Sequence, residues 1–376
     1  MSRASRLQAL AAQDPSNPIL LCDLLDELLG AGRVDEALAQ LHATEDGLRV
    51  LPAVKFREAR CALMTRDFTA VVKLLQPLVD GVGDVPAGIA HDLAYAQFSL
   101  GHFDAALQGL ADVRSQGEDA TAVALLKARV LHHQQQYGTA LDVLGAITHG
   151  ERLAEVLGLR AMLLLDSGDT AGAATTAGQA LVIDPAQYEA TIVAGTLALW
   201  EQRLDVSQAM FDQVLAIDPH SGRALLGVGQ NRMLRADIPA ARIALERATA
   251  AMPEHIGSWH ALAWCQLLEG DLAGAARSFE HAFAIDRTFG ETHGGMALVH
   301  ALRGDRVAAE ESIRRATRLD PHGASARYAR SVLLLDEGRP EEAQAIVDGI
   351  LQSPGRAMAV PADFIFRLRE LVRPRG

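Results

Sequence analysis

Arginine and ring-bearing side chains recur in the first half of the sequence at a spacing that could place them on one surface. They fall in three segments about 34 residues apart and comprise Arg57, Arg60, His91, Tyr95, Arg129 and His132, with His133 next to the last. A guanidinium binds a carboxylate through forked hydrogen bonds, and aromatic rings stack on guanidinium groups. This combination favours binding of an acidic protein segment. The alternative is that these are ordinary surface positions in a chain rich in arginine.

Apolar and aromatic residues take the corresponding positions later in the chain. The set that we expect to face a partner there is Ile192, Trp200, Leu226, Gln230, His260, Trp264 and Tyr328. Tryptophan is a preferred anchor at protein interfaces and is costly to leave exposed without a partner. Because two of the three tryptophans belong to this set, it predicts an apolar binding surface. The alternative is that Trp200 and Trp264 pack between structural elements of the protein itself.

The sequence lacks the residue patterns of known catalytic and metal sites. Gly227 and Gly229 are not followed by the third glycine of a phosphate loop, and we interpret them as packing positions in a helix. His132 and His133 are adjacent, hence about 100° apart around a helix and poorly placed to share a metal ion. The three cysteines are interpreted as small core residues: Cys22, Cys61 and Cys265. We therefore expect no enzyme, no bound metal and no cofactor.

The elements that position these residues come from one unit repeated about ten times. Its clearest marks are loop dipeptides spaced 34 residues apart: Asp184-Pro185, Asp218-Pro219, Met252-Pro253, Asp286-Arg287 and Asp320-Pro321. A fixed period of this size indicates a solenoid, in which every unit buries its apolar face against its neighbours.

Two columns of mostly small residues keep the same period. The first is Leu25, Ala59, Ala94, Ala128, Ala161, Gly195, Gly229, Ala263, Ala297 and Ser331, and the second is Ala37, Val71, Ala106, Ala140, Ala173, Ser207, Ala241, Ala275, Ala309 and Ala343. Antiparallel helices approach to about 8 Å only where neither presents bulk at the crossing, so the columns predict helical hairpins. Glycine favours the left-handed backbone that ends a helix, which places the turns at Gly101, Gly270 and Gly338.

With these features the chain resembles the tetratricopeptide repeat family. The match covers about residues 18–355 and is strongest from Tyr188 to Arg287, where Phe211, Leu245 and Phe279 fill the family's large apolar column. The resemblance implies an all-α fold, a right-handed α-solenoid of helix-turn-helix repeats. It also implies that the first helices line a concave groove that binds peptides or partner helices, with both residue sets above on that face.

The organisation predicted along the chain has three parts. Residues 1–17 form an N-terminal capping segment with Leu7 and Leu10 inward, residues 18–355 form about ten repeats in one solenoid, and residues 356–376 form a C-terminal capping helix and short tail. Terminal units of a solenoid must shield an apolar face. The alternative for the last helix is docking on a partner or a membrane surface, because arginines flank Phe364-Ile365-Phe366.

Composition limits the partners and the location. The net charge of −12 argues against general binding to nucleic acid, which needs a basic surface. No apolar run approaches the roughly 20 residues that span a bilayer. The start of the chain is too polar for the core of a signal peptide. We expect a cytoplasmic protein, and the scarcity of lysine and abundance of alanine favour a bacterial source.

The function that these features predict is protein binding without catalysis. We expect a scaffold or adaptor that binds a peptide or helix of a partner protein in the concave groove. The alternative is an accessory or regulatory subunit of a neighbouring enzyme or of a secretion or assembly system. A transcription regulator is disfavoured because only about 17 residues precede the first repeat, too few for a helix-turn-helix domain.

Overall fold

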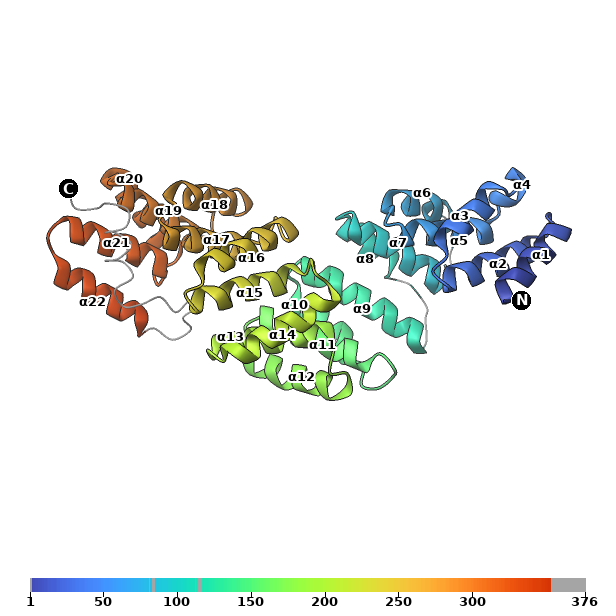
Figure 1. Ribbon diagram of the computed structural model, residues 1–376, viewed down its shortest axis with the longest axis horizontal. Coiled ribbons are helices and arrows are strands. Elements are labelled where there is room, and N and C mark those ends of the chain that lie inside the picture. Colours follow the sequence, from blue (N-terminus) through green and yellow to red (C-terminus); the bar gives the residue numbers. More distant parts are fainter. Residues whose placement is uncertain (1, 81, 83–84, 112, 114–116, 353–376) are drawn as a thin grey trace. The chain divides into compact units, whose positions relative to one another are not determined.

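Helices joined by short turns make up the described part of the chain, in which no strand is found (Figure 1). The structure, a computed structural model, describes residues 2–80, 82, 85–111, 113 and 117–352. The chain divides into two compact units, the first ending at Ile183 and the second beginning at Asp184. The predicted all-α fold is therefore confirmed.

The described residues of the first unit form five helical hairpins and two further helices. A first helix, α1 (Arg3–Gln13), precedes the hairpins, and a short helix, α4 (Asp46–Arg49), lies between the first two of them. The hairpins are α2–α3 (Pro18–Gly30, Val34–His42), α5–α6 (Pro52–Met64, Phe68–Val79), α7–α8 (Ala87–Ser99, Phe103–Gly109), α9–α10 (Gly117–His133, Tyr137–Gly145) and α11–α12 (Leu153–Asp166, Thr170–Ile183). The sequence did not predict α4.

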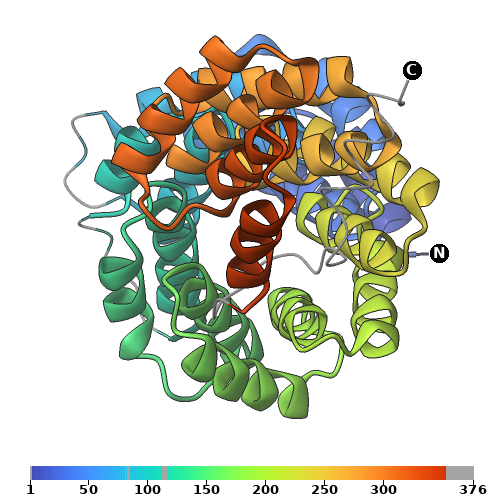
Figure 2. The ribbon, with the colours of Figure 1, turned by 90° about the vertical axis from the view of Figure 1, so that its left-hand side faces the viewer.

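The second unit has five hairpins in its described residues. They are α13–α14 (Tyr188–Trp200, Leu204–Ile217), α15–α16 (Gly222–Leu234, Ile238–Ala251), α17–α18 (Ile256–Glu269, Leu272–Ile285), α19–α20 (Gly290–Arg303, Arg306–Leu319) and α21–α22 (Ala324–Asp336, Pro340–Leu351). Each first helix contacts its own second helix, and α13 contacts α15, α15 contacts α17 and α19 contacts α21, so that helices run alongside one another within the unit (Figure 2). This is the arrangement that the repeat period predicts.

The two small-residue columns lie at the helix crossings. Every alanine in both columns is fully buried, as are the larger members Leu25 and Val71. A Cβ atom added to Gly229 in α15 would lie 2.5 Å from Cγ of Leu245, and one added to Gly227 would lie 2.2 Å from the Phe211 ring. Both glycines are therefore packing positions inside a helix, which confirms their interpretation from the sequence.

The turns between paired helices use the left-handed backbone. Gly101, Gly270 and Gly338 have φ between 73° and 79°, which confirms the predicted turn positions. The corresponding turns of four other hairpins place a side-chain-bearing residue in the same region, at φ between 59° and 61°: Arg66, Gln135, Gln202 and Ala236. Such residues are strained there because the Cβ atom crowds the following carbonyl.

The first helix of the chain packs on the first hairpin. Ala4 and Ala11 are buried and Leu7 is packed against the same cluster on α2. Leu10 is 47% exposed, so the expectation that it faces inward is wrong. Spacings of three and four residues put Ala4, Leu7 and Ala11 on one stripe of the helix, and Leu10 lies outside it.

The second unit contains one extended apolar core. It runs from Met233 to Ile350 and takes buried side chains from the first helices α17, α19 and α21. The predicted C-terminal cap, residues 356–376, lies outside the described residues. Assembly of both units into one continuous solenoid stays a prediction.

Candidate partner-binding surfaces

The arginine and aromatic set lies on three first helices of the first unit. Arg60 in α5 is exposed and makes no ion pair with any described residue. Tyr95 in α7 is 41% exposed, with its ring edge-on to Phe68 at 5.9 Å between centroids. Arg129 in α9 is half-buried. These three residues each follow a fully buried alanine of the first column, so the repeat gives them the same place on successive helices.

Arg57, one turn before Arg60, is already engaged by the protein. Its guanidinium donates two hydrogen bonds to the carboxylate of Asp26 on α2, at 3.0 Å from Nε and 2.6 Å from Nη2. A third, from Nη1, goes to the carbonyl oxygen of Ala53 at 2.9 Å. A forked pair of this kind fixes the side chain and uses the donors that a partner carboxylate would need.

The histidines of the set also have partners within the protein. His132 Nε2 lies 2.6 Å from Asp166 Oδ2, on α11, and both side chains are largely buried. His91 Nδ1 lies 3.3 Å from Asp92 Oδ1. The His133 ring stacks on Phe103 at 5.6 Å between centroids. Within the described residues, no group of three or more His, Cys, Asp or Glu side chains is placed to hold a metal ion.

The acidic partners of Arg57 and His132 were not predicted from the sequence, although the repeat period points to them. Arg57 and Asp26 are 31 residues apart, and His132 and Asp166 are 34 apart. Oppositely charged or hydrogen-bonding residues separated by about one period therefore lie on neighbouring first helices. A search at that spacing would have separated the engaged side chains from Arg60.

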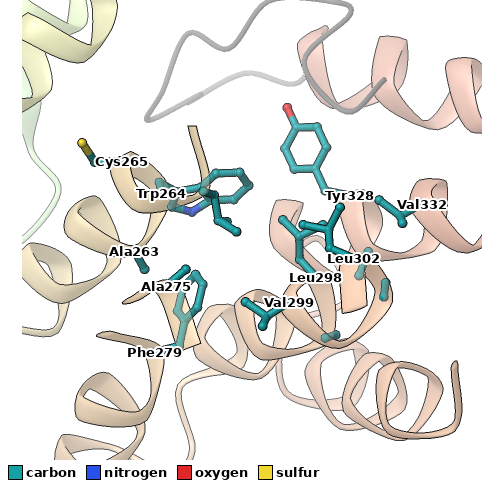
Figure 3. Packing of buried hydrophobic residues seen from close by; sticks show 14 of the residues in the cluster. Ala263, Trp264, Cys265, Ala275, Phe279, Leu298, Val299, Leu302, Tyr328 and Val332 are labelled. Carbon is teal, nitrogen blue, oxygen red and sulfur yellow. The ribbon is translucent and has the colours of Figure 1, made fainter. Parts of the chain in front are cut away.

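Three members of the later set are buried in the second unit. Ile192, Trp264 and Tyr328 are 3%, 7% and 4% exposed, respectively. The rings of Trp264 and Tyr328 meet edge to face at 5.6 Å between centroids, and Figure 3 shows both beside Leu298 in the core. This burial favours the alternative in which Trp264 packs between repeats.

Trp200 differs from Trp264 although both belong to the same set. It lies at the end of α13 and is 50% exposed. Leu226 and Gln230 on α15 are half-buried. Trp200 is thus the one tryptophan of the pair whose ring is accessible to a partner.

His260 lies inside the second unit with a neutral environment around it. Its Nε2 atom is 2.8 Å from the hydroxyl of Thr292, and its ring meets Phe279 and Phe289 edge to face at 5.4 Å. Burial lowers the pKa of His260 to about 4, because a charged ring would lose its hydration there. The ring is therefore neutral at physiological pH, which makes it a poor ligand for an acidic segment.

The repeat architecture agrees with a comparison to known families. Residues 296–357, which span parts of α19 to α22, match the family model for the tetratricopeptide repeat. These residues therefore belong to a tetratricopeptide repeat, which confirms the predicted resemblance over this part of the chain. The same hairpin recurs throughout the described residues, as the resemblance of the sequence implied. Repeats of this family generally serve as scaffolds for protein–protein interaction and are typically non-catalytic.

Several solved structures resemble this chain at low identity. A chain of the APC/C hetero-tetramer Cut9–Hcn1 is 13% identical over 98% of this chain and 89% of its own, with a TM-score of 0.47. PilF of Pseudomonas aeruginosa is 18% identical over 55% and 94%, with a TM-score of 0.43. YrrB, described as a TPR protein with an unusual peptide-binding site, is 18% identical over 52% and 97%, with a TM-score of 0.37. No curated protein matches the sequence.

The three cysteines are core residues, as predicted. All three are buried and free of disulfides. Burial raises the pKa of Cys61 to about 11 and that of Cys265 to about 12. Their thiols therefore stay protonated at neutral pH and lack the thiolate that nucleophilic chemistry requires.

None of the helices in the described ranges is both long and apolar enough to cross a membrane.

Proposed function

We propose that this protein is a non-catalytic scaffold that binds an acidic segment of a partner protein along α5, α7 and α9. The observation that carries the proposal is the difference between two arginines one turn apart. Arg57 is held by Asp26, whereas Arg60 is exposed and makes no ion pair with a described residue. Arg60 can therefore offer its donors to a carboxylate from outside.

The spacing of the repeat suits an extended ligand. Arg60, Tyr95 and Arg129 occupy one place in three successive first helices, so a segment that crosses these helices meets one of them per repeat. Arginine recognises a carboxylate through forked hydrogen bonds, and tyrosine adds an apolar face and a hydroxyl. The chain as a whole is acidic, so binding of an acidic segment depends on the local positive charge of Arg60 and Arg129.

The proposal also covers the absence of catalysis and the location of the protein. Tetratricopeptide repeats are typically non-catalytic, which supports the absence of catalysis. The amino-acid composition supports a location in the cytoplasm of a bacterium. An accessory subunit of an enzyme or of an assembly system would use the same surface, with that enzyme or system as the partner.

A binding assay with a defined probe tests the proposal. The probe is a fluorescein-labelled peptide of alternating glutamate and serine, and the readout is fluorescence anisotropy. Arg60→Glu should weaken binding by about tenfold, because it replaces an attraction by a repulsion worth about 1.4 kcal/mol. The affinity should also fall as salt is added.

Arg318→Glu is the matched control. Arg318 lies on the second helix α20, is exposed, and forms no ion pair within the described part of the chain. The substitution makes the same change of charge on another surface and should leave the affinity within about twofold. Equal losses in the two variants would mean that net charge, and not the surface on α5, α7 and α9, attracts the probe.

A further inference from the structure

The first unit contains a cleft on α6, α7 and α8, apart from the surface proposed above. Its volume is about 530 Å³, within the range of about 300 to 1,000 Å³ that is typical of small-ligand sites. Val79 and Leu93 contribute apolar walls, and Gln76, Gln97 and Gln108 contribute amide groups. None of the described residues that line it is charged. The lining therefore suits a neutral ligand with an apolar body and amide-like polar groups.

One buried amide oxygen in this cleft has no hydrogen-bond partner among the described residues. Gln97 is 8% exposed, and its Oε1 atom is buried and unpaired. The neighbouring Gly109 also lines the cleft, and a Cβ atom added there would lie 3.9 Å from this oxygen. An unpaired buried acceptor destabilises the protein, so a ligand that donates a hydrogen bond to it removes that cost and gains affinity.

A chain of hydrogen bonds fixes the orientation of the Gln97 amide. Gln76 Nε2 donates to Asp80 Oδ1 at 2.8 Å, which turns Gln76 Oε1 toward Gln97. Gln97 Nε2 donates to that oxygen at 3.2 Å. Rotating the Gln97 amide would bring two oxygens together, so its own Oε1 must remain directed away from Gln76.

The cleft coincides with an unusually short second helix. Helix α8 has 7 residues, whereas the second helices α6 and α12 of the same unit have 12 and 14. A short α8 covers less of α7 than a full-length second helix would. Leu93 and Gln97 of α7 thereby line a cleft instead of a closed helix crossing.

We propose that this cleft is a second binding site, which takes a short, neutral, aliphatic segment of a partner protein in extended conformation. One backbone N–H of the segment donates to Gln97 Oε1. The exposed amide of Gln108 is available to the next peptide group, and aliphatic side chains of the segment contact Val79 and Leu93. The cleft thus offers amide groups and apolar walls together, as the edge of a sheet does for an added strand.

A blocked dipeptide serves as the probe for this site. Acetyl-valyl-valine N-methylamide is titrated into the full chain at millimolar concentrations, and the methyl resonances of Val79 and Leu93 are followed by NMR. Saturable shifts of both are expected. The same dipeptide with N-methylated backbone amides keeps its apolar side chains but lacks the N–H donors, and it should bind at least fivefold more weakly.

Two variants test whether the cleft itself binds the probe. Gln97→Met keeps the length of the side chain and removes the acceptor, so the two probes should bind this variant equally. Gly109→Leu fills the cleft and should abolish the shifts while circular dichroism stays unchanged. The proposal is overturned if the natural dipeptide causes no saturable shift, which would mean that water alone occupies the cleft. Equal binding of both probes to the unmodified protein would also overturn it.

Discussion

The residue that follows the small side chain of a first helix has a different environment in α5 and α7 of the first unit and in α17, α19 and α21 of the second. In the first unit, Arg60 is exposed and Tyr95 is 41% exposed. In the second, Trp264 is 7% exposed, and Leu298 and Val332 are fully buried. The repeat gives these residues equivalent backbone positions. Whether such a position belongs to a surface or a core depends on the side chain and on how closely the neighbouring helix approaches.

Glycine allows that close approach in the second unit. A Cβ atom added to Gly294 in α19 would lie 2.7 Å from the backbone nitrogen of Ala326 in α21, a distance that real Cβ atoms do not tolerate. The corresponding position of α7 in the first unit holds His91, which is half-buried. Helices that meet through glycine leave no room for exposed groove residues between them. In α17, α19 and α21 these positions therefore contribute to the packed core, whereas in α5 and α7 they stay accessible to a partner.

The largest effect is expected when the buried and the exposed tryptophan of the second unit are each replaced by alanine. Trp264→Ala should lower the free energy of unfolding by about 3 to 5 kcal/mol, because it leaves a cavity beside Tyr328 and Leu298. Trp200→Ala should cost less than about 1 kcal/mol, since that ring is half exposed. Urea denaturation measures both. Similar losses in the two variants would break the distinction between a buried and an accessible tryptophan.

Lowering the pH should destabilise the second unit, because His260 is buried in its neutral form. The pKa of His260 is about 4 in the folded protein and its ordinary value is 6.5, so the unfolded chain binds a proton first as the pH falls. Stability is therefore retained above pH 6.5 and lost between pH 6.5 and 4, by up to about 3 kcal/mol. His260→Gln, which stays neutral, should flatten the profile in that window. Unfolding curves at several pH values check this, and identical profiles for both proteins would contradict burial of the ring.

Two glycine-to-alanine substitutions, one in each unit, compare how tightly the helices are packed. Gly227→Ala in α15 places a Cβ atom against the Phe211 ring and should cost about 1 to 3 kcal/mol. Gly178→Ala in α12 of the first unit meets no atom within 4 Å and should stabilise the helix by about 0.5 to 1 kcal/mol. Thermal unfolding should shift in opposite directions. A destabilised Gly178→Ala variant would show that packing on α12 is tighter than the structure indicates.

The smallest effect is expected where the two units are alike. Arg66 in the first unit and Ala236 in the second have φ of 61° and 59° in equivalent turns. Replacing either by glycine relieves the strain, although part of the gain is offset by the added freedom of the unfolded chain. Each variant should gain up to about 1 kcal/mol in denaturant unfolding. A gain confined to one unit would show that turn geometry depends on the unit and not on the repeat.

The repeat itself could be predicted from the sequence because its signals are local. Buried alanines at helix crossings and glycines with positive φ must recur at the period, whatever the neighbouring side chains are. The exposure of Trp264 could not be predicted, since it depends on Tyr328 and Leu298, which come from later helices. The pairing of Arg57 with Asp26 could be predicted only by comparing residues about one repeat apart, because Asp26 lies on another first helix.

The most direct test of the central claim measures stability and peptide affinity on the same two variants. Arg60→Glu should lower the affinity for the acidic probe by about tenfold and leave unfolding within about 0.5 kcal/mol of the unmodified protein. Trp264→Ala should do the reverse, losing several kcal/mol of stability while it keeps the affinity under conditions where it is folded. The account is contradicted if folded Trp264→Ala loses probe binding or if Arg60→Glu retains it.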